Sequence, residues 1–280
     1  PNMDAISKIL SQELPAIEIA FVRVTLQSLL LLPFILFKKG VKKIWPKNYF
    51  LHLLRGIFMS TWIVLIITAF KLMPLAEVIA IFFIEPLILT ILAAIFLKEK
   101  ITIYSILAIL TGFIGALIVI QPSFISIGWF ALLPLGAAFC FAIYLILTRI
   151  VSKTEEPVAL QFYAVFVAML ILGFINLIGY SNIIFLKPIW PENYLWFYLI
   201  ALGIIATIAH FLLVFAFKKA KTTILAPLQY LEIVGAAILG LLVFNEFPNK
   251  LQIFGILIIV ISGLYIIWKD NKNIKNNSKV

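Results

Sequence analysis

Long apolar runs follow one another along the chain, and short polar segments separate them. Each run has about the 20 residues that a helix needs to cross a bilayer core roughly 30 Å thick. The runs are continuous and do not alternate with polar residues, so outer-membrane strands are excluded. The pattern predicts an all-α, polytopic transmembrane bundle, with spans at 16–37, 49–70, 75–97, 102–120, 128–148, 158–178, 195–217, 223–244 and 251–268.

A shorter apolar segment precedes these spans. Residues 1–11 form about half a span and begin with Pro, which predicts an incomplete first helix and a bundle of ten helices. Asp4 and Lys8 interrupt its apolar residues. The segment therefore does not have the uninterrupted apolar region of a cleaved signal peptide.

Composition and charge narrow the class of protein. Hydrophobic residues make up 64% of the 280 residues and charged residues 12%, with a mean hydropathy of +1.16. A soluble chain has about a quarter charged residues, so cytosolic enzymes, nucleic-acid-binding domains and disulfide scaffolds are excluded. The net charge of +10 is spread over the segments between spans, so no nucleic-acid partner is expected.

Sequence motifs for catalysis and for cofactors are absent. The chain has no Gly-x-x-x-x-Gly-Lys-Ser/Thr, no Gly-x-Ser-x-Gly and no His-Glu-x-x-His. Cys140 is its single cysteine, which leaves no disulfide and no cysteine-rich metal site. We therefore expect no enzyme activity, no cofactor and no metal.

Lysine and arginine residues indicate the orientation in the membrane. If the incomplete first helix runs outward, most of them fall in segments on the cytoplasmic side, and Lys71, Lys187 and Lys250 fall on the exterior. Cytoplasmic loops of membrane proteins carry such an excess. The distribution predicts a multi-pass protein of the bacterial inner membrane with both termini in the cytoplasm.

An internal repeat relates the two halves of the chain. A shift of 147 residues aligns 56–99 with 203–246 without a gap, and it matches Glu85 with Glu232 and Glu99 with Glu246. The shift crosses five spans, so the second copy has the opposite orientation in the membrane. We expect a first repeat at 1–120, an inverted second repeat at 121–268, and a basic cytoplasmic tail at 269–280.

Several short motifs resemble a known family. The stretch Phe21-Val22-Arg23 and the span end at 97–100, Leu-Lys-Glu-Lys, are similar to EamA-type carriers of the drug/metabolite transporter superfamily. This resemblance implies a secondary carrier of a small metabolite. Narrower motifs resemble the branch that includes S-adenosylmethionine uptake carriers, and they lie at 4–8, 31–34, 54–56, 226–232 and 244–248.

Two carboxyl groups are the first candidates for a functional site. Glu85 and Glu232 each lie near the middle of a span, where a charge costs about 3 kcal/mol on insertion scales. Each must face a cavity, pair with a cation or hold a proton, which suits proton coupling or a cationic substrate. The structural alternative is a buried carboxyl group bonded to neighbouring helices.

Other ionisable residues lie inside the spans. Arg23 and Gln27 are four residues apart and share a helix face, and either Arg23 or Arg55 can bind a substrate carboxylate or neutralise a glutamate. Arg55 is also close enough to the inner interface to extend its charge into it, which we expect to be its commoner position. His210 can relay protons or pack with a hydrogen bond.

The remaining candidates are aromatic or flank the acids. Trp62 and Tyr230 can stack on a ring or bind a cation through cation–π attraction, or they can pack against lipid and neighbouring helices. Gln229 precedes Tyr230 directly. Asp4 and Lys8 stand at i and i+4, where they can neutralise each other or line the cavity.

These features predict a secondary transporter of a small polar or zwitterionic metabolite, which works by alternating access. The resemblance makes S-adenosylmethionine uptake or exchange the named possibility. A proton-coupled exporter of amino acids or other metabolites is the alternative within the class, and an intramembrane enzyme or a lipid-handling scaffold is the alternative outside it. The expected partners are a small-molecule substrate and the bilayer, with the chain as a monomer or a homodimer.

Overall fold

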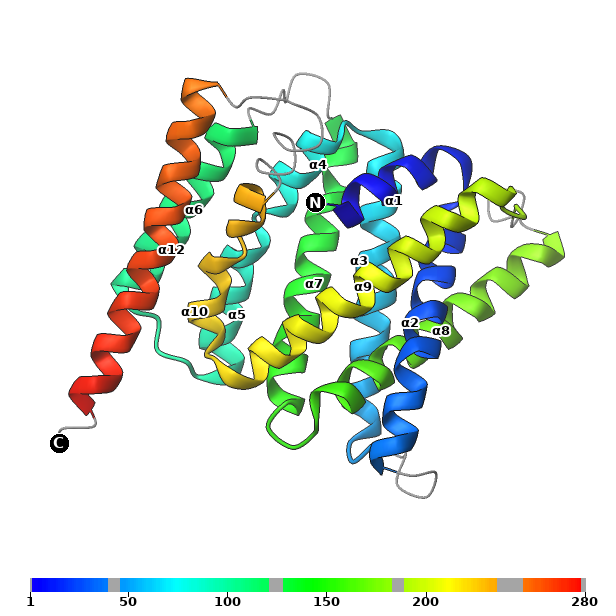
Figure 1. Cartoon of the computed structure of the whole chain (residues 1–280), viewed down its shortest axis with the longest axis horizontal. Coiled ribbons are helices and arrows are strands. Elements are labelled where there is room, and N and C mark those ends of the chain that lie inside the picture. Colours follow the sequence, from blue (N-terminus) through cyan, green and yellow to red (C-terminus); the bar gives the residue numbers. More distant parts are fainter. Residues whose placement is uncertain (1, 40–45, 121–127, 183–188, 236–248, 278–280) are drawn as a thin grey trace.

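The computed structural model of the chain describes residues 2–39, 46–120, 128–182, 189–235 and 249–277 (Figure 1). These residues form helices joined by short turns, and no strand occurs among them. The helices are α1 Asn2–Glu13, α2 Ala16–Lys39, α3 Tyr49–Leu72, α4 Leu75–Phe82, α5 Glu85–Leu97, α6 Ile103–Ile120, α7 Leu132–Val151, α8 Pro157–Asn182, α9 Asn193–Lys219, α10 Thr222–Leu228 and α12 Lys250–Asn277, with a 3-10 turn at Gly128–Ala131.

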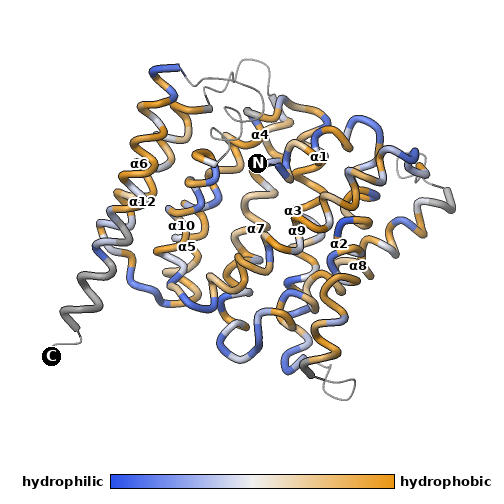
Figure 2. Tube along the Cα trace, in the orientation of Figure 1, coloured by the Kyte–Doolittle hydropathy of each residue, from blue (hydrophilic) through white to orange (hydrophobic). Residues whose placement is uncertain are grey.

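The predicted all-α transmembrane bundle is confirmed. Within the described ranges, six helical segments have the length and the apolar composition to cross a membrane, and α6 and α12 supply two shorter apolar helices. Hydrophobic residues cover the helices, and hydrophilic residues gather at the segments that connect them (Figure 2). Helix α12 continues to Asn277 and so takes in most of the predicted tail at 269–280. The end of the predicted span 223–244 lies outside the described residues.

Two predicted spans are wrong in detail because each is interrupted. Span 75–97 is divided into α4 and α5 by a turn at Phe83 and Ile84. Pro86 has no N–H to donate to the preceding turn of helix, which accounts for the interruption. In span 223–244, α10 ends at Leu228, a turn follows at 229–230, and the chain is helical again over 231–235. Here too a proline, Pro227, lies close to the interruption. These two turns are called the helix breaks below.

Small residues allow the long helices to pack closely. A Cβ atom at Gly56 of α3 would collide with Val167 of α8, and one at Gly203 of α9 would lie 2.7 Å from the Cβ atom of Leu26 on α2. Close approach of backbones through glycine is a common basis of helix association in membranes. The shift of 147 residues matches these two glycines. The contacts α3–α8 and α9–α2 therefore have the same form.

Candidate functional site

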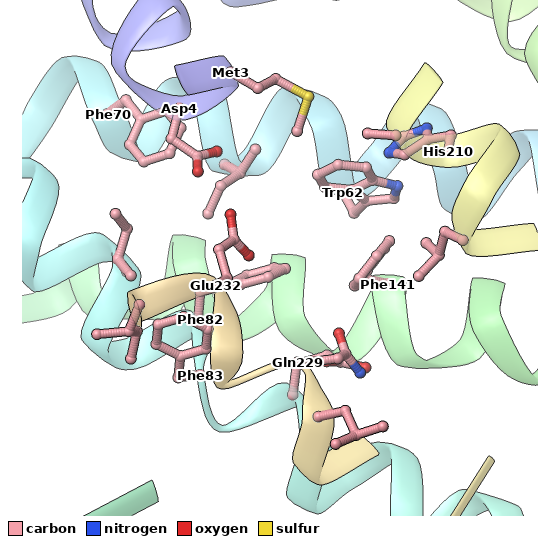
Figure 3. A pocket seen from close by; sticks show the side chains of 17 residues that line it. Met3, Asp4, Trp62, Phe70, Phe82, Phe83, Phe141, His210, Gln229 and Glu232 are labelled. Carbon is pink, nitrogen blue, oxygen red and sulfur yellow. The ribbon is translucent and has the colours of Figure 1, made fainter. Parts of the chain in front are cut away.

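The helix breaks lie beside a cavity within the bundle (Figure 3). It has a volume of about 440 Å³, within the range of small-molecule sites. Helices α1, α3, α4, α5, α7, α9 and α10 supply side chains to it, together with the two helix breaks and the helical residues 231–235. The lining residues are Met3, Asp4, Trp62, Ile66, Phe70, Ile79, Phe82, Phe83, Glu85, Phe141, Ala209, His210, Leu213, Leu228, Gln229, Glu232 and Ile233.

Three carboxyl groups line this cavity. Asp4 and Glu232 point toward each other across it (Figure 3). Glu85 begins α5 directly after the first helix break; its side chain is 1% exposed, and its Oε1 has no hydrogen-bond partner among the described residues. A carboxylate buried without an ion pair is unfavourable, so a cation or a proton that reaches Glu85 binds favourably.

Three aromatic rings form a continuous part of the cavity lining, called the aromatic wall below. The ring of Trp62 lies 4.8 Å from that of Phe141 and 6.5 Å from that of Phe82, between centroids. Phe141 and Phe82 are 5.8 Å apart. Rings at these separations make stable offset contacts, and their faces attract cations. The cavity thus combines carboxyl groups with aromatic surface.

A buried cation lies behind the aromatic wall. The guanidinium of Arg23 lies 5.3 Å from the centroid of the Trp62 ring, and its Nη2 donates to His210 Nε2 over 3.5 Å. Arg23 is buried and is absent from the described lining, whereas Trp62 and His210 contribute to it. Arg23 therefore supports two lining residues. Gln27, one turn along α2 from Arg23, is also buried, and its amide atoms have no hydrogen-bond partner among the described residues.

Arg55 is buried in a separate polar cluster, so the expectation that it extends to the interface is wrong. Its Nε donates to Thr148 over 3.1 Å and its Nη1 to the carbonyl of Leu160 over 2.5 Å. Nη1 also lies 3.4 Å from Nδ1 of His52, whose Nε2 donates to Glu155 over 3.1 Å. This chain of contacts holds α3 against α7 and α8 and replaces the hydration of the guanidinium. Arg55 does not belong to the described lining of the cavity.

Two further candidates bind backbone carbonyls. Lys8 donates its ammonium protons to the carbonyls of Phe70 and Met73, the latter over 2.9 Å, at the C-terminal end of α3. A cation at this position interacts favourably with the helix dipole. The Tyr230 hydroxyl donates to the carbonyl of Phe83 over 3.1 Å. Neither residue is part of the described lining.

The structure therefore brings Asp4, Trp62, Glu85, His210, Gln229 and Glu232 to one cavity and places Arg23 directly behind two of them, Trp62 and His210. Sequence reasoning missed Phe82 and Phe141. Phe82 precedes the candidate Glu85 by only three residues, and this proximity could have indicated that it belongs to the site. Phe141 is an apolar residue in an apolar span, so nothing in the sequence distinguishes it from its neighbours. No group of three His, Cys, Asp or Glu side chains within the described ranges has metal-binding geometry.

A helical membrane bundle with interrupted helices beside an internal cavity is typical of secondary transporters. The chain belongs to the EamA-like transporter family, whose model matches residues 3–121 and again residues 128–268.

Relatives of this chain are named for different solutes. The S-adenosylmethionine uptake transporter of Rickettsia bellii is 31% identical over 273 residues, which cover 96% of this chain and 89% of that protein. The riboflavin transporter of Brucella anthropi is 28% identical over 260 residues, which cover 92% of this chain and 90% of that protein. A solved crystal structure at 17% identity superimposes with a TM-score of 0.74 over 94% of this chain and 93% of that chain, which shows the shared fold.

Proposed function

We propose that this chain is a secondary carrier that moves a small cationic or zwitterionic metabolite through the cavity between Asp4, Glu85, Glu232 and Trp62. The observation that carries the proposal is the pairing of three carboxyl groups with aromatic rings in one cavity. Carboxylates bind ammonium and sulfonium groups by charge, and aromatic faces bind them by cation–π attraction. The family and the names of the relatives support transport over catalysis.

S-Adenosylmethionine is the substrate that we propose. It carries a sulfonium, an ammonium and a flat adenine ring, which match the acids and the aromatic wall. The name of the Rickettsia bellii relative supports the same substrate. The lysine distribution supports an orientation in the bacterial inner membrane with both termini in the cytoplasm, and the name of the same relative supports uptake or exchange.

Alternating access of two inverted repeats is the proposed mechanism. The family model matches each half of the chain once, and the two helix breaks are matched by the shift of 147 residues. Inverted repeats with interrupted helices place a site between two units that can rock against each other. Glu85 and Glu232, one from each repeat, would then face each side of the membrane in turn.

Counterflow in proteoliposomes tests the proposal. Vesicles that contain the full chain and unlabelled S-adenosylmethionine should accumulate labelled S-adenosylmethionine without chemical change. S-Adenosylhomocysteine lacks the sulfonium charge and should compete at least tenfold less well, because a charge contact contributes about 2 kcal/mol or more. Riboflavin, the solute named for another relative, serves as a further competitor.

Matched variants test whether the flux depends on the acids of the cavity. Glu85→Gln and Glu232→Gln should each reduce counterflow at least tenfold, about the effect of 1.4 kcal/mol. Glu77→Gln is the control, because Glu77 is a buried glutamate of α4 outside the described lining of the cavity. Equal flux in all three variants would contradict the site. A chemically altered solute would indicate an enzyme, and the absence of flux for every solute would indicate a scaffold.

Proton-coupled export of an amino acid is the second candidate, and the buried Oε1 of Glu85 without a hydrogen-bond partner favours it. A carboxyl group in that position can take up and release a proton during the transport cycle. Imposed pH gradients of either sign distinguish this candidate. Export with proton exchange requires accumulation that reverses with the gradient and disappears in Glu85→Gln.

A further inference from the structure

A side-chain hydrogen bond joins the two helix breaks. The hydroxyl of Tyr230 in one break donates to the carbonyl oxygen of Phe83 in the other over 3.1 Å. Their rings lie 5.6 Å apart between centroids. Tyr230 is fully buried, so no bulk water reaches the hydroxyl in place of this partner. The bond therefore connects two parts of the chain that are 147 residues apart.

The carbonyl of Phe83 is available because the helix is broken there. In a continuous helix it would accept from the N–H of Leu87, but that N–H donates to the carbonyl of Ile84 over 3.1 Å. Pro86 has no N–H to offer in its place. A backbone carbonyl without a partner in an apolar interior is costly, and the Tyr230 hydroxyl removes that cost.

A glycine on a third helix makes room for the tyrosine ring. A Cβ atom at Gly112 of α6 would lie 2.5 Å from Cδ2 of Tyr230, which is closer than real Cβ contacts. The ring therefore fits only because residue 112 has no side chain. The contact fixes the position of the ring independently of its hydroxyl.

We propose that Tyr230 is a positioning residue that sets the separation of Glu85 and Glu232. Each acid follows its own end of the bond by two residues, Glu85 after Phe83 and Glu232 after Tyr230. A bond between the two breaks therefore holds the two acids at a fixed spacing on the cavity wall. Of the two matched residues only Tyr230 has a hydroxyl, so this hydrogen bond depends on Tyr230. Its role in transport rests on the function proposed above.

Three variants of the full chain in lipid nanodiscs and proteoliposomes test this proposal. Tyr230→Phe keeps the ring and removes the donor. Gly112→Ala keeps the donor and displaces the ring. Tyr144→Phe is the matched control, because the Tyr144 hydroxyl also makes a buried bond between helices, to Gln161 over 2.9 Å, away from the breaks.

Amide hydrogen exchange tests the bond without any substrate. We expect exchange at residues 84–88 and 231–233 to rise at least tenfold in Tyr230→Phe and Gly112→Ala and to stay unchanged there in Tyr144→Phe. Unchanged exchange at both breaks in Tyr230→Phe would overturn the proposal, even if Gly112→Ala failed to fold.

Transport kinetics test the positioning role. In Tyr230→Phe the KM for S-adenosylmethionine counterflow should rise at least fivefold with less than a twofold change in the maximal rate, since a misplaced pair of acids weakens binding. Faster exchange at the breaks with an unchanged KM would overturn the positioning role. If the wild-type chain transports no solute while Tyr230→Phe still loosens both breaks, the proposed function fails and the connection between the breaks stands.

Discussion

Arg149 at the end of α7 donates from Nη1 to the carbonyl of Phe217 at the end of α9, over 2.6 Å. Lys8 of α1 makes the same kind of contact with the carbonyl of Phe70 at the end of α3. The shift of 147 residues matches Phe70 with Phe217. Helices α3 and α9 end at opposite ends of the bundle (Figure 1). A hydrogen bond from a basic side chain to a carbonyl at a helix end therefore occurs at both ends of the bundle.

Glu99 makes further interactions beside Arg149, at the same end of the bundle. Its carboxylate accepts from the N–H groups of Thr222 and Thr223, over 3.3 and 3.1 Å, at the start of α10. Arg149 Nε lies 3.7 Å from the same carboxylate. A carboxylate at a helix N-terminus satisfies free N–H groups and complements the dipole. Together Arg149 and Glu99 connect the ends of α5, α7 and α9 to the start of α10.

Removal of Arg149 should loosen this end of the bundle. Arg149→Gln loses the contacts to α9 and Glu99, and we expect a loss of about 1 kcal/mol because the pair is partly exposed. That corresponds to a fall of about 2–4 °C in Tm, which thermal unfolding in detergent can measure. Lys153→Gln, on the exposed turn after α7, is the control and should leave Tm unchanged. Equal Tm values for the two variants would contradict the connecting role.

Arg55 should matter for stability and leave solute recognition unaffected. Arg55→Gln removes a fully buried charge from contacts with Thr148, Leu160 and His52. Breaking a buried charged network of this kind costs about 3–5 kcal/mol. We expect a large fall in Tm and in yield of folded protein, with an unchanged KM for the fraction that folds. A changed KM at normal stability would indicate that Arg55 contacts the solute.

Trp62 should distinguish cationic from neutral ligands. Trp62→Leu removes the ring that faces the cavity, and loss of a desolvated cation–π contact costs about 1–2 kcal/mol, or roughly 5- to 30-fold in affinity. Trp62→Phe should keep most of the affinity. Binding of S-adenosylmethionine by calorimetry measures the effect, and S-adenosylhomocysteine should be weakened much less in Trp62→Leu. Equal losses for both ligands would indicate packing without cation recognition.

The spans could be predicted from the sequence because a span needs only a run of about 20 predominantly apolar residues, a length that the bilayer thickness sets. Most predicted spans coincide with helices to within a few residues. The helix breaks were not predicted, since Pro86 and Pro227 indicate a lost hydrogen bond but not whether the helix bends or stops. The stop in α4–α5 depends on a partner for the Phe83 carbonyl, and that partner, Tyr230, is remote in sequence.

The candidate site was predictable where a residue was unusual for its surroundings. Asp4, Glu85, Glu232 and His210 are polar groups inside apolar segments, and the structure places all four on the cavity; their roles remain predictions. The position of Arg55 was not predictable, because its partners come from α7 and α8, about 90–105 residues later.

Alternating exposure of the cavity is the central claim, and one cysteine can test it. Ala209 lines the cavity and is exposed, so Ala209→Cys in a Cys140→Ala background provides a single accessible thiol. A membrane-impermeant maleimide applied to each face of oriented vesicles measures its exposure. We expect labelling from both faces, with S-adenosylmethionine slowing it at least fivefold on both. Labelling from one face alone, unaffected by any solute, would contradict a carrier that opens to each side in turn.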